Sequence, residues 1–380
     1  MRRLFANDFV LRILRIALQL VMLCAAVLVV RPPQPLIQLG SQQHVHTQAE
    51  LAGVHTRFVD EAEEWKIQRG LSMVREMGVP WIVEFFPWPY YEPTRGNFDW
   101  GSADRIVDHA NRQGLRVIAR LGFVPTWARP ATVNGQPTTF TYLEEKDYGL
   151  LADFSAAFVS HFKGRINHVV IWNEPNLIGE WGLRLVDAAA YVRMLQVVYP
   201  AIKTANPDVQ VLVGALAPTL EPIGGTQGLN DLIYLEQMYA ALSLLAKSAR
   251  PYDAWAVHSY GQVDPPEAAP APDRINFRRL ELLRQVMREH GDDEVPVYIT
   301  EAGWNDDMRW ANGVSPAQRI TYTLAAWAYA RVHWPYVRCV AMWVFKLPAP
   351  AHGYRDHFTF VDPSLQPAPI YDEVKRALTQ

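Results

Sequence analysis

Residues 169–176 read Val169-Val170-Ile171-Trp172-Asn173-Glu174-Pro175-Asn176, an apolar, β-branched run that leads straight into a carboxylate. Such a run favours a buried strand, so the pattern places Glu174 at the carboxyl end of that strand. A second stretch follows the same plan and reads Val297-Tyr298-Ile299-Thr300-Glu301-Ala302-Gly303-Trp304. Two glutamates at the ends of two buried strands, each near tryptophan, indicate a pair of carboxylates that acts on one substrate.

From Leu51 onward, apolar strand patterns alternate with amphipathic helix patterns. The candidate strands are 52–58, 80–86, 115–121, 166–173, 210–216, 254–260, 295–301 and 337–345. This alternation is typical of a parallel sheet that is buried on both faces. Eight such units predict an α/β fold, a closed (β/α)₈ TIM barrel, in which the two glutamates face the same mouth. A doubly wound open sheet is the alternative, but no Gly-x-Gly-x-x-Gly or P-loop sequence follows the first strand.

Three segments are predicted: a signal anchor or signal peptide at 1–30, a linker at 31–50 and the barrel at 51–380. Met1-Arg2-Arg3 precedes a largely apolar run from Phe9 to Val30, and this basic flank points inward. We favour an uncleaved membrane anchor, and a cleaved signal peptide is the alternative. Either one exports the barrel, which then contacts the membrane through the N-terminal segment only or is secreted.

Composition excludes some classes of partner. The chain has 380 residues with 49% hydrophobic content and a net charge of -3, so the basic excess that favours nucleic acid is missing. Its two cysteines, Cys24 and Cys339, lie in an N-terminal apolar run and a predicted strand, which argues against a structural disulfide. No Cys/His spacing typical of zinc sites occurs. We therefore expect no metal and no cofactor. Aromatic residues make up 12%, including 13 tryptophans, enough for a sugar-binding cleft or for a large core.

The two glutamate motifs resemble the signatures of clan A retaining glycoside hydrolases, which include cellulase-like and β-xylosidase-like (β/α)₈ enzymes. The resemblance extends to His258-Ser259-Tyr260, to Trp343 and to the run Glu92-Pro93-x-x-Gly96-x-Phe98-x-Trp100, so it covers most of 51–380. It implies hydrolysis of a β-linked oligo- or polysaccharide by double displacement. Two carboxylates about 5–5.5 Å apart permit this route. A separation of about 6.5–9.5 Å leaves room for a water molecule, whose direct attack inverts the configuration at the anomeric carbon.

The resemblance also implies roles for single residues. Glu174 would be the general acid/base and Glu301 the nucleophile. Asn173 would bind the sugar 2-hydroxyl, Tyr260 would orient Glu301 and His258 would support the site. Trp343 would form the floor of the subsite for the reacting sugar, followed by a non-proline cis peptide to Val344.

Other candidates for substrate binding remain open between two interpretations. Arg57 and Arg120 are each placed to hold Glu301 ionised, and the sequence does not decide which one faces inward. His55 is a site residue or a core histidine. Trp88, Trp127 and Trp181 stack on sugar or pack the loops that follow the strands, and Trp304 is a further candidate for substrate binding.

Two other functions fit the same motifs. A glycan-binding barrel without chemistry would use the same aromatic cleft, and an unsuitable distance between the carboxylates would favour it. A transglycosylase would share the covalent intermediate but exclude water, and product analysis with an added acceptor sugar would reveal it.

Overall fold

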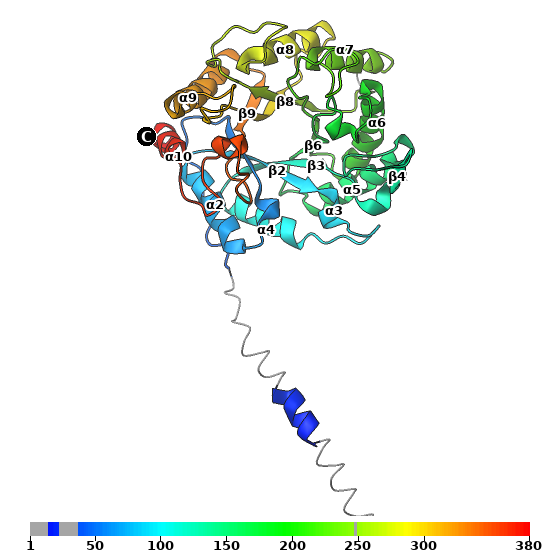
Figure 1. Ribbon diagram of the computed structural model, residues 1–380, viewed down its shortest axis with the longest axis vertical. Helices are drawn as coiled ribbons and strands as arrows, with labels where there is room; N and C mark the ends of the chain where they lie inside the picture. Colours follow the sequence, from blue (N-terminus) through cyan, green and yellow to red (C-terminus); the bar gives the residue numbers. More distant parts are fainter. Residues whose placement is uncertain (1–13, 23–36, 247–248) are drawn as a thin grey trace, which may run out of the picture. The chain divides into compact units, whose positions relative to one another are not determined.

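The computed structural model describes residues 14–22, 37–246 and 249–380. Within these residues, eight parallel strands close into a barrel in the order β1-β10-β9-β8-β7-β6-β3-β2 (Figure 1). The barrel strands are β1 (Ala52–Thr56), β2 (Trp81–Pro87), β3 (Arg116–Gly122), β6 (His168–Ile171), β7 (Gln210–Val213), β8 (Ala254–Tyr260), β9 (Val297–Gly303) and β10 (Val337–Met342). The predicted (β/α)₈ barrel is confirmed, and each strand lies within its predicted range to within a few residues. A separate short hairpin joins β4 (Thr132–Val133) and β5 (Gln136–Pro137).

Helices surround the strands as an outer ring (Figure 1). They are α2 (Glu64–Glu76), α3 (Trp88–Tyr91), α4 (Gly101–Arg112), α5 (Tyr148–His161), α6 (Ala188–Ala205), α7 (Asp231–Leu242), α8 (Leu280–Glu289), α9 (Pro316–His333) and α10 (Pro369–Thr379). Most of them connect one strand to the next around the barrel. Because parallel strands need such crossovers, the carboxyl ends of all barrel strands meet at one mouth.

Two apolar cores hold the barrel together. The larger core lies between strands and helices, where residues such as Val54 and Ile171 meet the buried faces of the helices. The smaller core fills the barrel interior with side chains that include Val83, Leu212 and Cys339. Gly53 allows this close packing, because a Cβ atom there would lie 2.9 Å from the sulfur of Cys339. The bottom of the barrel is therefore a packed core, which leaves the mouth for chemistry.

Strand β9 carries an irregularity where Glu301 lies. Against β8, Val257 pairs with Ile299, but the next residue, His258, pairs with Glu301. The register against β10 shifts over the same stretch of β9. The register against both neighbouring strands thus shows that β9 holds one extra residue, a bulge, around Thr300. Bulges occur near active sites because they redirect a side chain, and this one brings His258 level with Glu301.

The compact unit that contains the barrel extends from Leu39 to Gln380. It starts earlier than the predicted boundary at residue 51, because the segment before β1 is bonded to the helices. The backbone N–H of Gln43 donates to the carbonyl of Arg112, and that of Gln48 donates to the carbonyl of Leu378, both at 2.8 Å.

Residues 1–38 form a separate unit. The predicted signal anchor at 1–30 lies largely outside the described residues, as does Cys24, while residues 14–22 are helical. Among residues 14–22, 37–246 and 249–380, no helix has both the length and the apolar character that a membrane span requires.

Candidate active site

A pocket of about 410 Å³ opens where the barrel strands end. Its wall combines strand-end residues with residues of the following loops. They are Arg57, Arg120, Asn173, Glu174, Glu180, Tyr260, Gln262, Glu301, Gly303, Trp304, Asn305, Trp310, Asn312, Trp343, Tyr354, Arg355 and Phe358. The two glutamates predicted from the sequence therefore share one cavity.

Glu174 lies just past the end of β6, in a sharply turned piece of backbone. Trp172 and Glu174 have φ angles of 74° and 41°, in the left-handed region that non-glycine residues seldom adopt. The backbone N–H of Glu174 donates to the carbonyl of Ala215 at 2.9 Å, which ties the turn to the segment after β7. Backbone strain of this kind persists only where surrounding contacts enforce it, and it concentrates at functional sites.

Three kinds of group surround the carboxylate of Glu301. Nη1 of Arg120 donates to Oε1 at 2.7 Å, and the hydroxyl of Tyr260 donates to Oε2 at 2.8 Å. Nε2 of His55 and Nε2 of His258 each lie 3.8 Å from Oε1. Both oxygens of Glu301 thus have a donor that favours the ionised form.

The electrostatics of the site follow from these contacts. Burial by itself would raise the pKa of Glu301, but His258, Arg120 and the Tyr260 hydroxyl outweigh it and hold that pKa well below its usual value. Burial lowers the pKa of His55 to about 3, with Arg120 adding to the effect, so His55 is neutral. Burial also opposes protonation of His258, yet Glu301 and Glu174 together raise its pKa.

Glu174 has a single side-chain partner in the site. Nδ1 of His258 lies 2.8 Å from Oε1 of Glu174. One imidazole therefore stands between the two carboxylates and bonds only to Glu174. The supporting role predicted for His258 fits this position.

The distance between the carboxylates bears on the chemistry. One oxygen of Glu174, one of Glu301 and one nitrogen of His258 all lie within 4.8 Å of one another. In the described residues this is the one trio of potential metal ligands found close together. Glu174 is hydrogen-bonded to His258, and Glu301 accepts hydrogen bonds from Arg120 and Tyr260, so both carboxylates have partners within the protein.

The structure distinguishes the two candidate arginines. Arg120 extends from β3 to Glu301 and also donates to Oδ1 of Asn173 at 2.7 Å. Arg57 lines the pocket, but its Nη2 donates to Asp60 at 2.6 Å. Of the two, Arg120 is thus the cation that binds Glu301.

The candidate tryptophans divide between the pocket and the core. Trp343 lines the pocket, half-buried, with its ring edge-on to Phe358, and the predicted cis peptide to Val344 is present. Trp304 contributes to the wall but is buried, and its indole N–H donates to the carbonyl of Asp264 at 2.8 Å. Gly261 makes room for that indole, since a Cβ atom there would lie 2.0 Å from the Trp304 ring.

Trp88 and Trp127 lie outside the residues that line the pocket, and the burial of Trp88 favours the packing interpretation for that residue. Trp88 is fully buried, stacks on Phe154 at 5.5 Å and donates to the Glu92 carboxylate at 2.6 Å. Trp127 is half-buried, edge-on to Trp88, and its indole N–H donates to the carbonyl of Glu92. Together they fix the loops after β2 and β3.

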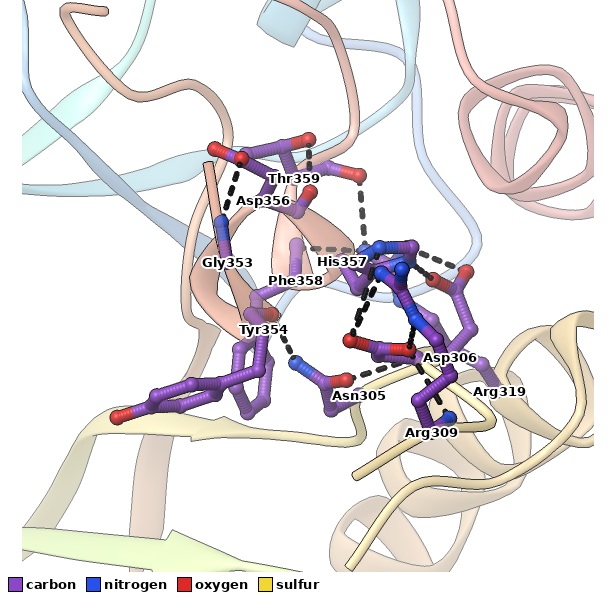
Figure 2. A network of polar contacts seen from close by, with 11 residues as sticks. Asn305, Asp306, Arg309, Arg319, Gly353, Tyr354, Asp356, His357, Phe358 and Thr359 are labelled. Atoms are coloured by element: carbon purple, nitrogen blue, oxygen red, sulfur yellow. Dashed lines mark hydrogen bonds and ion pairs between the residues drawn. The ribbon is translucent and has the colours of Figure 1, made fainter. Parts of the chain in front are cut away.

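Loops after β9 and β10 form one wall of the pocket and are tied together by charge. Figure 2 shows Asp306 between Arg319 of α9 and His357, bonded to them at 3.0 Å and 3.1 Å. Asn305 donates to the carbonyl of Tyr354 at 2.6 Å (Figure 2). Trp310 stacks on Tyr354 at 4.9 Å. Sequence patterns did not identify this wall, because its residues come from irregular loops.

Glu180 is a pocket carboxyl group that sequence reasoning missed. It belongs to the 3-10 helix η4 (Gly179–Trp181), in the loop after β6, and lines the pocket beside Asn173 and Glu174. Burial, followed by the charge of Glu174, raises its pKa to about 7. The only signal in the sequence was a carboxylate close behind the Trp172-Asn173-Glu174 motif.

Comparison with known proteins agrees with the resemblance predicted from the sequence. Residues 58–137 match the family model of glycoside hydrolase family 42, described as β-galactosidase. A family 39 glycoside hydrolase from the gut symbiont Bacteroides cellulosilyticus WH2 has a similar structure, with a TM-score of 0.67 and 20% identity. The match covers 87% of this chain and 64% of that enzyme, so the chain spans less than two thirds of its length.

Two further structures extend this likeness. A monomeric β-xylosidase from Caulobacter crescentus CB15 matches with a TM-score of 0.60 and 19% identity over 88% of this chain and 69% of its own. The β-glycosidase BGL167 matches with a TM-score of 0.60 and 16% identity over 89% of this chain and 97% of its own. At these identities the likeness shows a common barrel fold, and function has to be argued from the site.

Proposed function

We propose that this chain is a retaining O-glycoside hydrolase that acts on a β-linked oligo- or polysaccharide, with Glu301 as nucleophile and Glu174 as general acid/base. The observation that carries the proposal is the pair itself: two carboxylates with oxygens within 4.8 Å of each other, in one pocket, with different surroundings. Such a close approach supports the retaining route, in which no water has to fit between the two carboxylates.

In the first step, a Glu301 oxygen attacks the anomeric carbon while the bond from that carbon to the glycosidic oxygen breaks. Glu174 gives its proton to the departing oxygen, and a covalent glycosyl-enzyme results. In the second step, water attacks the anomeric carbon, Glu174 takes a proton from that water, and the bond to Glu301 breaks. The sugar is released with its original anomeric configuration.

The neighbouring residues fit these steps. Arg120 and Tyr260 keep Glu301 charged and fix its orientation through bonds to both oxygens. Asn173, held by Arg120 at 2.7 Å, presents its amide to the 2-hydroxyl of the reacting sugar. Trp343 offers the half-buried ring on which that sugar lies. The similar structures include a β-xylosidase and a β-glycosidase, which supports a β-linked substrate.

Covalent labelling tests this proposal. The purified chain is incubated with a panel of activated 2-fluoro-glycosides, whose fluorine slows release of the glycosyl-enzyme, and is then examined by intact mass and peptide mapping. We expect an adduct on the peptide that contains Glu301 and none in the Glu301→Gln variant. The sugar that reacts identifies the substrate.

Other results would favour the rival functions. Measurable glycan binding without an adduct from any sugar would refute catalysis and favour a glycan-binding barrel. An adduct on Glu301 that is transferred to an added acceptor sugar, with little hydrolysis, would instead favour a transglycosylase.

We also propose that the barrel is exported and held at the membrane by residues 1–30. The basic residues before the apolar run support this orientation. Protease treatment of intact cells that express the full chain tests it. Digestion of the barrel at the cell surface is expected, and complete protection until lysis would contradict export. Release of the barrel into the medium would indicate cleavage of the segment.

A further inference from the structure

The turn that follows β8 contains a pocket residue to which the proposed reaction gives no role, Gln262. The backbone N–H of Asp264 donates to the carbonyl of Gly261 at 3.1 Å, so Gln262 and Val263 are the two central residues of this turn. Gln262 has a φ angle of 53°, in the left-handed region. Turns with a positive φ at this position favour glycine, which has no Cβ atom to crowd the backbone, or asparagine and aspartate. The chain therefore keeps a glutamine where the local backbone disfavours it.

Contacts with the end of β9 hold this turn in its strained shape. The backbone N–H of Gly261 donates to the carbonyl of Gly303 at 3.1 Å. The indole N–H of the buried Trp304 donates to the carbonyl of Asp264 at 2.8 Å. Strain of this kind persists where surrounding contacts enforce it, and it concentrates at functional sites. The side chain of Gln262 therefore starts from a fixed backbone position.

The amide of Gln262 has an unused acceptor. Gln262 is half-buried and lines the pocket together with Tyr260 and Trp304. Its Oε1 atom is buried and has no hydrogen-bond partner among the residues that the structure describes. A buried acceptor without a donor is costly, and few such atoms remain in folded proteins. A molecule bound in the pocket can provide the missing donor.

The position of Gln262 and the chemistry of its oxygen indicate which donor this is. Tyr260, two residues earlier in the chain, donates to Oε2 of Glu301 at 2.8 Å. Two residues of extended chain span at most about 7 Å, so Gln262 lies close to the carboxylate at which the sugar reacts. Sugar hydroxyl groups donate hydrogen bonds, whereas an ionised carboxylate on a ligand only accepts them. The unpaired oxygen therefore suits a neutral sugar hydroxyl.

We propose that Gln262 is a specificity-determining residue whose amide oxygen accepts a hydrogen bond from one hydroxyl group of the substrate. This inference rests on the proposed function and narrows its substrate class. That hydroxyl group has to be free, so sugars that are deoxygenated, methylated or esterified at its position are poor substrates. Glycine would relieve the strain of the turn but would leave the hydroxyl without its acceptor.

The experiment measures kcat/KM on a disaccharide built from the sugar whose 2-fluoro-glycoside labels Glu301, and on its monodeoxy analogues, one for each hydroxyl group. Wild type is compared with Gln262→Met, in which a side chain of similar length lacks the amide oxygen. For wild type, the analogue that lacks the bound hydroxyl is expected to lose about ten- to a hundredfold relative to the parent, because the amide oxygen stays unpaired. In Gln262→Met this loss is expected to shrink to less than about threefold, while the ratios for the other analogues stay as in wild type.

Two further variants separate substrate binding from folding. Gln262→Gly suits the positive φ angle, so its thermal unfolding temperature should equal or exceed that of wild type. Its kcat/KM on the parent disaccharide is nevertheless expected to fall about ten- to a hundredfold. Gln285→Met removes an exposed amide of α8 that donates to Glu289, outside the lining of this pocket, and should leave every ratio unchanged.

Ratios between the parent and all analogues that are the same in Gln262→Met as in wild type would overturn the proposal. This holds even if the variant is slower throughout, because a uniform loss indicates a structural role. An adduct on Glu301 together with such unchanged ratios would refute the role of Gln262 and leave the proposed function standing. Absence of both an adduct and hydrolysis of any glycoside would refute the proposed function itself, and the role of Gln262 with it.

Discussion

The ends of β6 and β9 each deliver a glutamate after an apolar run, yet they surround it differently. Glu301 is 10% exposed and receives Arg120 at 2.7 Å and Tyr260 at 2.8 Å, with two histidines nearby. Glu174 is 18% exposed, and its one side-chain partner in the site is His258 at 2.8 Å. The end of β9 stabilises a charge on Glu301, whereas the end of β6 leaves Glu174 with one imidazole partner and with Glu180 in the same pocket lining.

The different partners of Glu301 and Glu174 show how one barrel mouth can give two chemically identical side chains different environments. Donors at both oxygens of Glu301 favour its anion, which the proposed nucleophile requires, whereas Glu174 has one imidazole partner and shares its pocket with Glu180. Each of the following variants changes one of the two glutamates or a residue close to it.

The largest effect is expected at Glu301. Glu301→Gln keeps one acceptor oxygen for Arg120, and its amide can donate to the Tyr260 hydroxyl, but it cannot form the glycosyl-enzyme. We therefore expect kcat to fall more than about a thousandfold on every substrate. Steady-state kinetics with aryl glycosides measure the loss, and circular dichroism verifies the fold. Wild-type turnover in a folded variant would exclude Glu301 as the nucleophile.

Glu174→Gln is expected to act selectively. Without the general acid, hydrolysis of glycosides with poor leaving groups falls by about 10²–10⁴-fold, while formation of the covalent intermediate from dinitrophenyl glycosides changes far less. Comparison of pre-steady-state bursts for the two substrate classes provides the measurement. Equal losses for both classes would mean that Glu174 does not protonate the leaving group.

Tyr260→Phe is expected to have a smaller effect on kcat/KM, through the carboxylate of Glu301. The hydroxyl lowers the pKa of Glu301. Glu301 must be ionised to attack. Removal of the Tyr260 hydroxyl is therefore expected to shift the acid limb of kcat/KM to higher pH and to lower the rate about tenfold. Tyr329→Phe, which removes a hydroxyl bonded to Glu281 far from the pocket, is the matched control. An unmoved acid limb would show that Tyr260 does not stabilise the anion.

The smallest expected effect concerns stability. The pKa of Glu180 is raised to about 7 in the folded chain, so the folded state binds this proton more tightly than the unfolded state. Wild type therefore loses stability as the pH rises from about 4.5 to about 7. Glu180→Gln removes this loss and should be more stable than wild type by about 1–2 kcal/mol at pH 8, with little difference at pH 4.

Thermal unfolding of the two proteins at both pH values measures that difference. Glu267→Gln, which removes an exposed carboxylate from the loop after β8, serves as the control. A Glu180→Gln variant that gains no stability at pH 8 relative to pH 4 would contradict the raised pKa. Such a result would also weaken the comparison between the two strand ends.

Local patterns in the sequence were enough to predict the barrel and its central pair. Strand β9 is predicted by the apolar run before Glu301, and helix α9 by periodic apolar residues, because both signals arise within one element. The position of Glu174 and Glu301 at a shared mouth follows from the parallel connections alone. The resemblance then suggested roles for Asn173 and Tyr260, which do lie beside the pair.

Tertiary structure decided what those patterns leave open. The choice of Arg120 over Arg57, the burial of Trp88 and the entry of Glu180 into the pocket each depend on contacts between distant parts of the chain. The wall near Asp306 is likewise fixed by Arg319 and His357 (Figure 2). Periodicity reports which face of one element is buried, whereas loop positions depend on packing against other elements. The sequence alone therefore determined the scaffold and the two glutamates, and only the folded chain assigned them their surroundings.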